Sequence, residues 1–226
     1  MFDGNGFYYA MLLSGAVAGV TAYFLNAKIF KRGGFKKGYP ALAVFCCALP
    51  AALVLSFVTA YLIRDDLRGL SLPELLPILG KEYFFTLVYF SALSAAAFWV
   101  FGLPFAALDK AAPSLAAFSA IARIGCLWAG CCGGINGVPT AELELAFGVT
   151  AFVLLQFFCK KGALLKYVAA YSAFRLIAEF FRAEPAPYHA VQICAAAALA
   201  VAGAAFLYAG RAAGKKELRI EKLRTK

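Results

Sequence analysis

The stretch PALAVFCCALPAALVLSFVTAYL, residues 40–62, contains no charged side chain. A transmembrane helix needs about 20 predominantly apolar residues, and this stretch meets that requirement. The whole chain has the same character, since 63% of its 226 residues are hydrophobic and 15% are charged. A soluble domain is about 45–50% apolar and about 25% charged. The sequence therefore predicts an all-α integral membrane protein.

Working outward from this stretch, we find six further apolar segments that are long enough to cross a membrane. The seven predicted transmembrane helices are residues 7–27, 40–62, 83–104, 113–131, 143–159, 165–182 and 189–209. The sequence shows no internal repeat and no long linker. We therefore predict one transmembrane domain, residues 1–210, followed by a basic tail, residues 211–226.

The distribution of Lys and Arg predicts the orientation of the chain. Basic residues gather between residues 28 and 37, between residues 160 and 166, and in the tail. With seven spans these three clusters lie on one side of the membrane, and Lys and Arg are enriched in cytoplasmic loops. We therefore predict an extracellular N-terminus and a cytoplasmic C-terminus. Because the clusters flank apolar segments, the net charge of +10 indicates membrane anchoring and no nucleic-acid partner.

Two arginines lie inside predicted spans, where a charge is costly and usually faces a cavity or a partner. Arg123 begins the stretch RIGCLWAGCCGG, residues 123–134, and Arg175 lies in YSAFRLIAEFFRAEP, residues 171–185. A guanidinium group stays charged at every relevant pH and binds phosphate through two hydrogen bonds. We therefore expect these arginines to bind the phosphate of an anionic phospholipid.

The second arginine belongs to a polar stripe along one face of its helix. Tyr171, Glu179 and Arg182 lie four residues before, four after and seven after Arg175. An Arg175–Glu179 pair that locks helices together is one interpretation. The alternative is anion binding, since the stripe holds two arginines for one glutamate and Arg123 adds a third.

Small residues and thiols surround Arg123 in sequence. Gly130 and Gly134 remove side-chain bulk, so that helices pack closely or a ligand approaches the backbone. The run that contains Cys126 and Cys131 has no matching second pair for a usual zinc site, and the single histidine is distant in sequence. We therefore expect no metal and no cofactor. The thiols either pack in the interior or include a reactive group beside the guanidinium.

These stretches resemble the prolipoprotein diacylglyceryl transferases, seven-helix enzymes of the bacterial plasma membrane. RIGCLWAGCCGG is similar to the family's signature in the fourth helix, and YSAFRLIAEFFRAEP to its R-x3-E-F-x-R-x-P helix. Weaker matches are Tyr9 in the first helix, Asp109 and Pro113 before the signature, PTAELE ending at Glu144, and VQICA near Gln192. The resemblance runs from about Tyr9 to Gln192.

The resemblance implies transfer of a diacylglyceryl group from phosphatidylglycerol to a cysteine thiol of a lipoprotein precursor, with release of glycerol phosphate. Arg123 and Arg175 match the family's two functional arginines. Glu179 is then expected to orient Arg175. The residues expected at the lipid are Arg182, Cys126, Gly130, Gly134, Tyr9, Tyr171 and Glu144.

The chain departs from the family pattern in the half of the site that would handle the thiol. The family's His-Gly-Gly motif has no match in the third helix, where Tyr89 stands nearby. The asparagine and glutamate of the signature are Cys126 and Cys131 here. Our hypothesis is that Tyr89 or Cys131 accepts the thiol proton. Two alternatives stay open: a phospholipid-dependent transferase with another acceptor, and a phospholipid-binding membrane protein without catalytic activity.

Overall fold

The computed structural model of the chain describes residues 4–26, 34–64, 83–104, 106–129, 134–159, 161–182, 193–197, 199–200 and 203. These residues form helices joined by turns. The one β-contact among them is an isolated antiparallel bridge between Gly134 and Arg182. The predicted all-α class is therefore confirmed for this part of the chain.

Five segments of the described helices are long and apolar enough to cross a membrane. They lie in α1, α2 and α4, in α5 together with α6, and in α7. The helix α8 has 17 residues, near the lower limit for a span. The bounds are α1 Gly4–Asn26, α2 Gly34–Ile63, α4 Tyr83–Val100, α5 Ala106–Asp109, α6 Ala112–Ala129, α7 Thr140–Phe157 and α8 Ala163–Glu179, with a 3-10 helix, η2, at Ile135–Gly137.

The structure shifts several predicted boundaries by a few residues and leaves others as predictions. The fifth span, predicted as residues 143–159, lies in Thr140–Phe157, and the sixth, predicted as residues 165–182, lies in Ala163–Glu179. The third span ends at Val100 and not at residue 104, because Gly102 adopts a left-handed φ of 62° and Pro104 follows. Of the predicted seventh span, residues 189–209, the structure describes the helical residues 193–197, 199–200 and 203. The tail, residues 211–226, lies outside the described residues. The count of seven spans and the extracellular N-terminus stay predictions.

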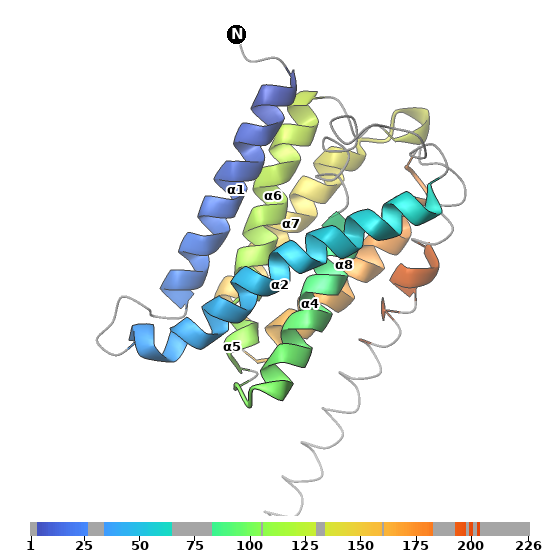
Figure 1. The fold of residues 1–226 in the computed structure, drawn as a ribbon. Coiled ribbons are helices and arrows are strands. Elements are labelled where there is room, and N and C mark those ends of the chain that lie inside the picture. Colours follow the sequence, from blue (N-terminus) through green and yellow to red (C-terminus); the bar gives the residue numbers. More distant parts are fainter. Residues whose placement is uncertain are drawn as a thin grey trace, which may run out of the picture.

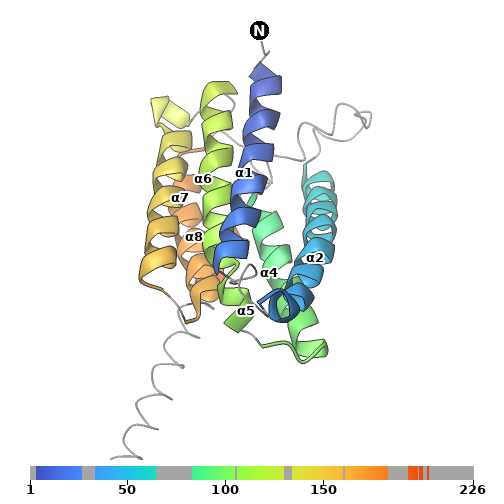
Figure 2. The same ribbon diagram turned by 90° about the vertical axis from the view of Figure 1, so that its left-hand side faces the viewer.

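The helices form two groups (Figures 1 and 2). The helices α1, α6 and α7 stand side by side, α2 pairs with α4, and α8 contacts α4, α6 and α7. Gly15 and Gly19 allow the close packing of α1 on α6, because a Cβ atom at either position would lie 3.1 Å from a carbonyl oxygen of α6. Small residues have this role in membrane helix pairs, where backbones approach one another closely.

Contacts at the two ends of the bundle fix how the helices are staggered. At the end where α1 begins, which we call the N-terminal end, the rings of Phe7 and Trp128 lie 4.8 Å apart between centroids. At the opposite end, Asp109 caps α8: its carboxylate accepts hydrogen bonds from the backbone nitrogens of Gly162 at 2.8 Å and Leu164 at 3.3 Å. Trp and Tyr are enriched at the two membrane interfaces. Trp99 near the end of α4 and Trp128 near the end of α6 are exposed, as this enrichment predicts.

Candidate active site

The polar stripe predicted on α8 is present and lies in the interior. The Nε of Arg175 donates to Glu179 Oε2 at 2.9 Å, one helical turn further along. Tyr171 is buried one turn before Arg175, and its hydroxyl has no hydrogen-bond partner among the described residues. That hydroxyl interacts electrostatically with Glu144, with Arg175 and with two further arginines. The stripe therefore faces a charged site and not lipid.

Glu144 of α7 is the centre of this site, because three arginine side chains converge on it. Its Oε1 accepts hydrogen bonds from Arg175 Nη1 at 2.7 Å and from Arg182 Nη1 at 2.8 Å. Its Oε2 pairs with Nε of Arg123, which α6 supplies. The carboxylate of Glu144 on α7 thus forms ion pairs with side chains of α6 and of the α8 segment.

We call these five side chains the arginine cluster: Arg123, Arg175, Arg182, Glu144 and Glu179. None of the five residues is more than 8% exposed. Their formal charge is 3 − 2 = +1. An unpaired charge at the centre of a membrane helix costs about 2.5–3.5 kcal/mol on insertion scales, so the carboxylates stabilise the buried guanidinium groups. Guanidinium groups gathered in this way match the geometry of a phosphodiester, which they bind through paired hydrogen bonds.

The backbone around Gly134 places Arg182 against the cluster. Gly134 and Arg182 form the isolated β-bridge, and Ile135 N donates to the carbonyl oxygen of Phe181 at 2.7 Å. A Cβ atom at Gly134 would lie 2.4 Å from the Val138 carbonyl oxygen and 2.8 Å from that of Phe181. Only glycine fits such a close approach of two backbones. The predicted role of Gly134 in removing bulk is consistent with this contact.

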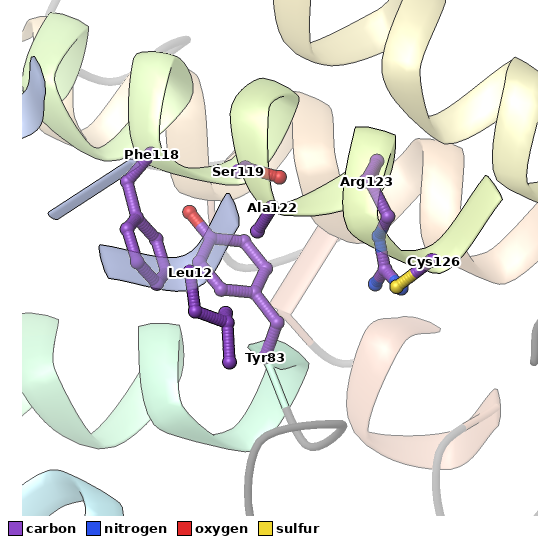
Figure 3. Close-up of a pocket in the computed structure, with 7 residues that line it drawn as sticks. All are labelled: Leu12, Tyr83, Phe118, Ser119, Ala122, Arg123 and Cys126. Carbon is purple, nitrogen blue, oxygen red and sulfur yellow. The ribbon is translucent and has the colours of Figure 1, made fainter. Parts of the chain in front are cut away.

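A small cavity adjoins Arg123 (Figure 3). Its volume is about 20 Å³, and its polar lining comes from Arg123, Cys126 and Ser119 of α6 and from Tyr83 at the start of α4. The Nη1 of Arg123 donates to Cys126 Sγ at 3.5 Å. A space of this volume holds about one water molecule. A phosphate group therefore enters only if the surrounding side chains move apart.

The structure brings most of the predicted site residues together, but not all of them. Tyr89 shares a hydrogen bond of 2.6 Å with Thr59 between α2 and α4. In the described part of the chain its polar contact is therefore with Thr59 and not with the arginine cluster. Tyr9 is 45% exposed on α1. Gly130 and Cys131 lie outside the described residues.

The sequence contained a signal for the central role of Glu144 that the motif comparison did not use. From residue 143 to residue 157, Glu144 is the single charged residue in α7. A lone carboxylate in an apolar helix needs a buried cationic partner. Arg123 and Arg175 were already placed inside spans, so the two arginines and this glutamate could have been paired with one another. Nothing in the sequence indicates in a comparable way that Tyr83 lines the cavity beside Arg123.

The fold and the site define a class: a helical membrane protein whose interior holds a cluster of arginines paired with glutamates. The model of the prolipoprotein diacylglyceryl transferase family matches residues 8–209, and the chain belongs to this family. The resemblance that the arginine-bearing stretches suggested is therefore confirmed. Membership makes the chain a membrane-bound transferase of lipoprotein biosynthesis. Neither a curated protein nor a solved structure matches the chain.

Proposed function

We propose that the chain transfers a diacylglyceryl group from phosphatidylglycerol to the cysteine thiol of a lipoprotein precursor in the bacterial plasma membrane. The family supplies the class of reaction. The arginine cluster supports the donor, because it gathers three buried guanidinium groups in one place. Phospholipid phosphate is the natural monoanion in a bilayer, and guanidinium matches its geometry.

In this proposal Arg123 and Arg175 bind the phosphate and stabilise the leaving group. The acceptor sulfur forms a bond to the glyceryl carbon, the bond between that carbon and the phosphate oxygen breaks, and glycerol phosphate leaves with the electron pair. Negative charge grows on the departing phosphate, where fixed cationic donors lower the barrier. Glu179 orients Arg175 through its ion pair with Nε. Arg182 holds the headgroup on the side of the N-terminal end.

Phosphate binding requires a rearrangement, because the guanidinium groups of Arg123 and Arg175 contact Glu144 in this structure. We propose that the phosphate takes over part of these contacts and that Glu144 neutralises the arginines between turnovers. The cavity beside Arg123 leaves free space next to one of the two guanidinium groups that would bind the phosphate.

The thiol proton must go to a base when the acceptor sulfur attacks. Tyr89 and Cys131 stay our candidates for this role. The contact of Tyr89 with Thr59 means that Tyr89 would act only after that hydrogen bond is exchanged. In the sequence, Cys131 is two residues beyond the last residue of α6 and five residues after Cys126, which lies beside Arg123.

The test is to incubate purified protein with phosphatidylglycerol and a lipobox peptide. We expect glycerol phosphate release that requires both substrates, together with a diacylglyceryl thioether on the peptide cysteine by mass spectrometry. A peptide with serine at that position is the control. Release from lipid without peptide would show a transferase or hydrolase with another acceptor. Lipid binding without any release would show a phospholipid-binding protein that is not an enzyme.

A further inference from the structure

A second, larger cavity lies in the seam between the two groups of helices. Its volume is about 200 Å³, and we call it the seam groove. Residues of α1, α2, α4 and α6 line it, among them Ala16, Cys46, Phe90, Ser114 and Phe118. None of the described residues that line the groove carries a charge.

The groove has a closed floor and an open side. Tyr23, Phe45 and Phe90 on its floor are at most 9% exposed. Val20 and Leu49 on its rim are 49% and 44% exposed. Both rim residues belong to helices that are long and apolar enough to span the membrane, so the open side faces the hydrocarbon of the bilayer. An apolar cavity of about 150 Å³ stays dry and binds benzene, so the seam groove has room for a longer hydrocarbon segment.

One side chain, Phe118, separates the groove from the cavity beside Arg123. Phe118 lines both the seam groove and the cavity beside Arg123. Arg123 lies five residues beyond Phe118 on α6, about 7.5 Å along the axis, and Ser114 lies nine residues before Arg123, about 13.5 Å away. Nine residues are about two and a half helical turns, so Ser114 and Arg123 lie on opposite faces of α6. A phospholipid whose phosphate lies at Arg123 therefore reaches the groove with an acyl chain that passes Phe118.

We propose that the seam groove holds one acyl chain of the phospholipid whose phosphate the arginine cluster binds, and that it sets the enzyme's preference for chain length. This inference rests on the proposed function, because it takes the donor to be an anionic phospholipid. The arginine cluster selects a lipid with an anionic headgroup, and the length of the groove selects the length of the lipid's acyl chain.

Two neighbouring cysteines of α2 provide a matched test. Cys46 lines the groove, whereas Cys47 is not among its lining residues, and both are exposed. The protein is kept in maltoside detergent with Cys159 and Cys194 changed to serine. Variants that retain either Cys46 or Cys47 are alkylated with N-ethylmaleimide, and the signal of a variant that lacks both is subtracted.

We expect dioleoyl-phosphatidylglycerol to slow alkylation of Cys46 and not of Cys47. At ten times the half-saturating lipid concentration, a thiol that reacts only when the groove is free reacts about 11-fold more slowly. Dihexanoyl-phosphatidylglycerol, whose chains are short, should give little protection. Equal slowing of both cysteines, or of neither, would overturn the inference.

A second experiment fills the groove. Ala16→Phe places a ring at the groove, and Val17→Phe is the control, because Val17 is the next residue of α1, is 60% exposed and does not line the groove. Glycerol phosphate release is measured with the dioleoyl and the dihexanoyl donor. We expect Ala16→Phe to lose about tenfold more turnover with the long-chain than with the short-chain donor, which corresponds to about 1.4 kcal/mol.

The outcomes separate the two proposals. Retained turnover of the short-chain donor by Ala16→Phe shows that this variant is folded. If the ratio of the two rates is the same for Ala16→Phe, Val17→Phe and the unchanged protein, the groove does not hold the chain. If no donor of either length yields glycerol phosphate while Cys46 is still protected, the groove assignment stands and the proposed transfer reaction is wrong.

Discussion

The substitution Glu144→Gln gives the strongest test of how the interior is held together. It keeps the size of the side chain and removes the carboxylate charge on which Arg123, Arg175 and Arg182 converge. The formal charge of the arginine cluster rises from 3 − 2 = +1 to 3 − 1 = +2. Gln still accepts hydrogen bonds, so the perturbation is chiefly electrostatic.

The expected loss of stability follows from burial, since Glu144 is 2% exposed and its three arginine partners are at most 8% exposed. Removing one partner of a buried ion pair destabilises a protein by about 3–5 kcal/mol, because the other charge is left without compensation. For a domain of this size about 1 kcal/mol shifts Tm by roughly 2–4 °C. We therefore expect Glu144→Gln to lower Tm by about 6–20 °C.

The assay is thermal unfolding in detergent followed by far-UV circular dichroism. Glu142→Gln is the control: Glu142 lies on the same helix and is exposed, so we expect a change within about 0.5 kcal/mol. The double variant Glu144→Gln with Arg182→Gln returns the charge to 2 − 1 = +1 and should regain part of the lost stability. Added phosphatidylglycerol should raise the Tm of Glu144→Gln by more than it raises that of the unchanged protein, because the lipid phosphate replaces the lost anion.

The reasoning is refuted if Glu144→Gln and Glu142→Gln unfold within about 1 °C of each other, since this is less than the shift that even 1 kcal/mol produces. A double variant less stable than Glu144→Gln alone would also contradict it, because relief of cationic repulsion should outweigh the loss of one hydrogen bond.

Three further predictions concern topology, the cap of α8 and the base. Asn5→Cys and Thr225→Cys, in a background without other reactive thiols, should be labelled from opposite sides of the membrane; labelling from one side contradicts the orientation drawn from the basic loops. Asp109→Ala should lower the free energy of unfolding by about 1.5–3 kcal/mol, because it removes the charged acceptor of two backbone hydrogen bonds, and Asp109→Asn should lower it by less. Equal melting temperatures for the unchanged protein and both variants would exclude the cap. Tyr89→Phe or Cys131→Ser should flatten the rise of kcat/KM with pH if that residue is the base, and unchanged profiles for both would remove both candidates.

The apolar pattern of the sequence was enough to predict the helices but not their exact ends. Long uncharged runs such as residues 40–62 cannot be anything but buried in lipid or protein, and the structure has α2 there. The third span was predicted to continue to residue 104 because its apolar character continues. Backbone conformation ends it earlier, at the left-handed Gly102.

Contacts within one helix could be predicted from the sequence, whereas contacts between helices could be predicted only where two buried charges inside apolar spans require each other. Arg175 and Glu179 are four residues apart, so helical geometry alone pairs them. The pairing of Glu144 with Arg182 joins residues that are far apart in the chain, and no local rule specifies it. The position of Tyr89 shows the same limit, because α4 is apolar on all sides and its sequence does not fix which face meets α2 or the site.

The most direct test of the central claim measures glycerol phosphate release from phosphatidylglycerol and a lipobox peptide by Arg123→Lys and Arg175→Lys. Lysine keeps the charge but has no planar fork with which to bind phosphate through two hydrogen bonds. We predict that each variant, with circular dichroism like that of the unchanged protein, turns over at least about 100-fold more slowly, as when one fixed donor to a developing charge is lost. If both variants fold and release glycerol phosphate at nearly the unchanged rate, these arginines do not bind the phosphate of the donor.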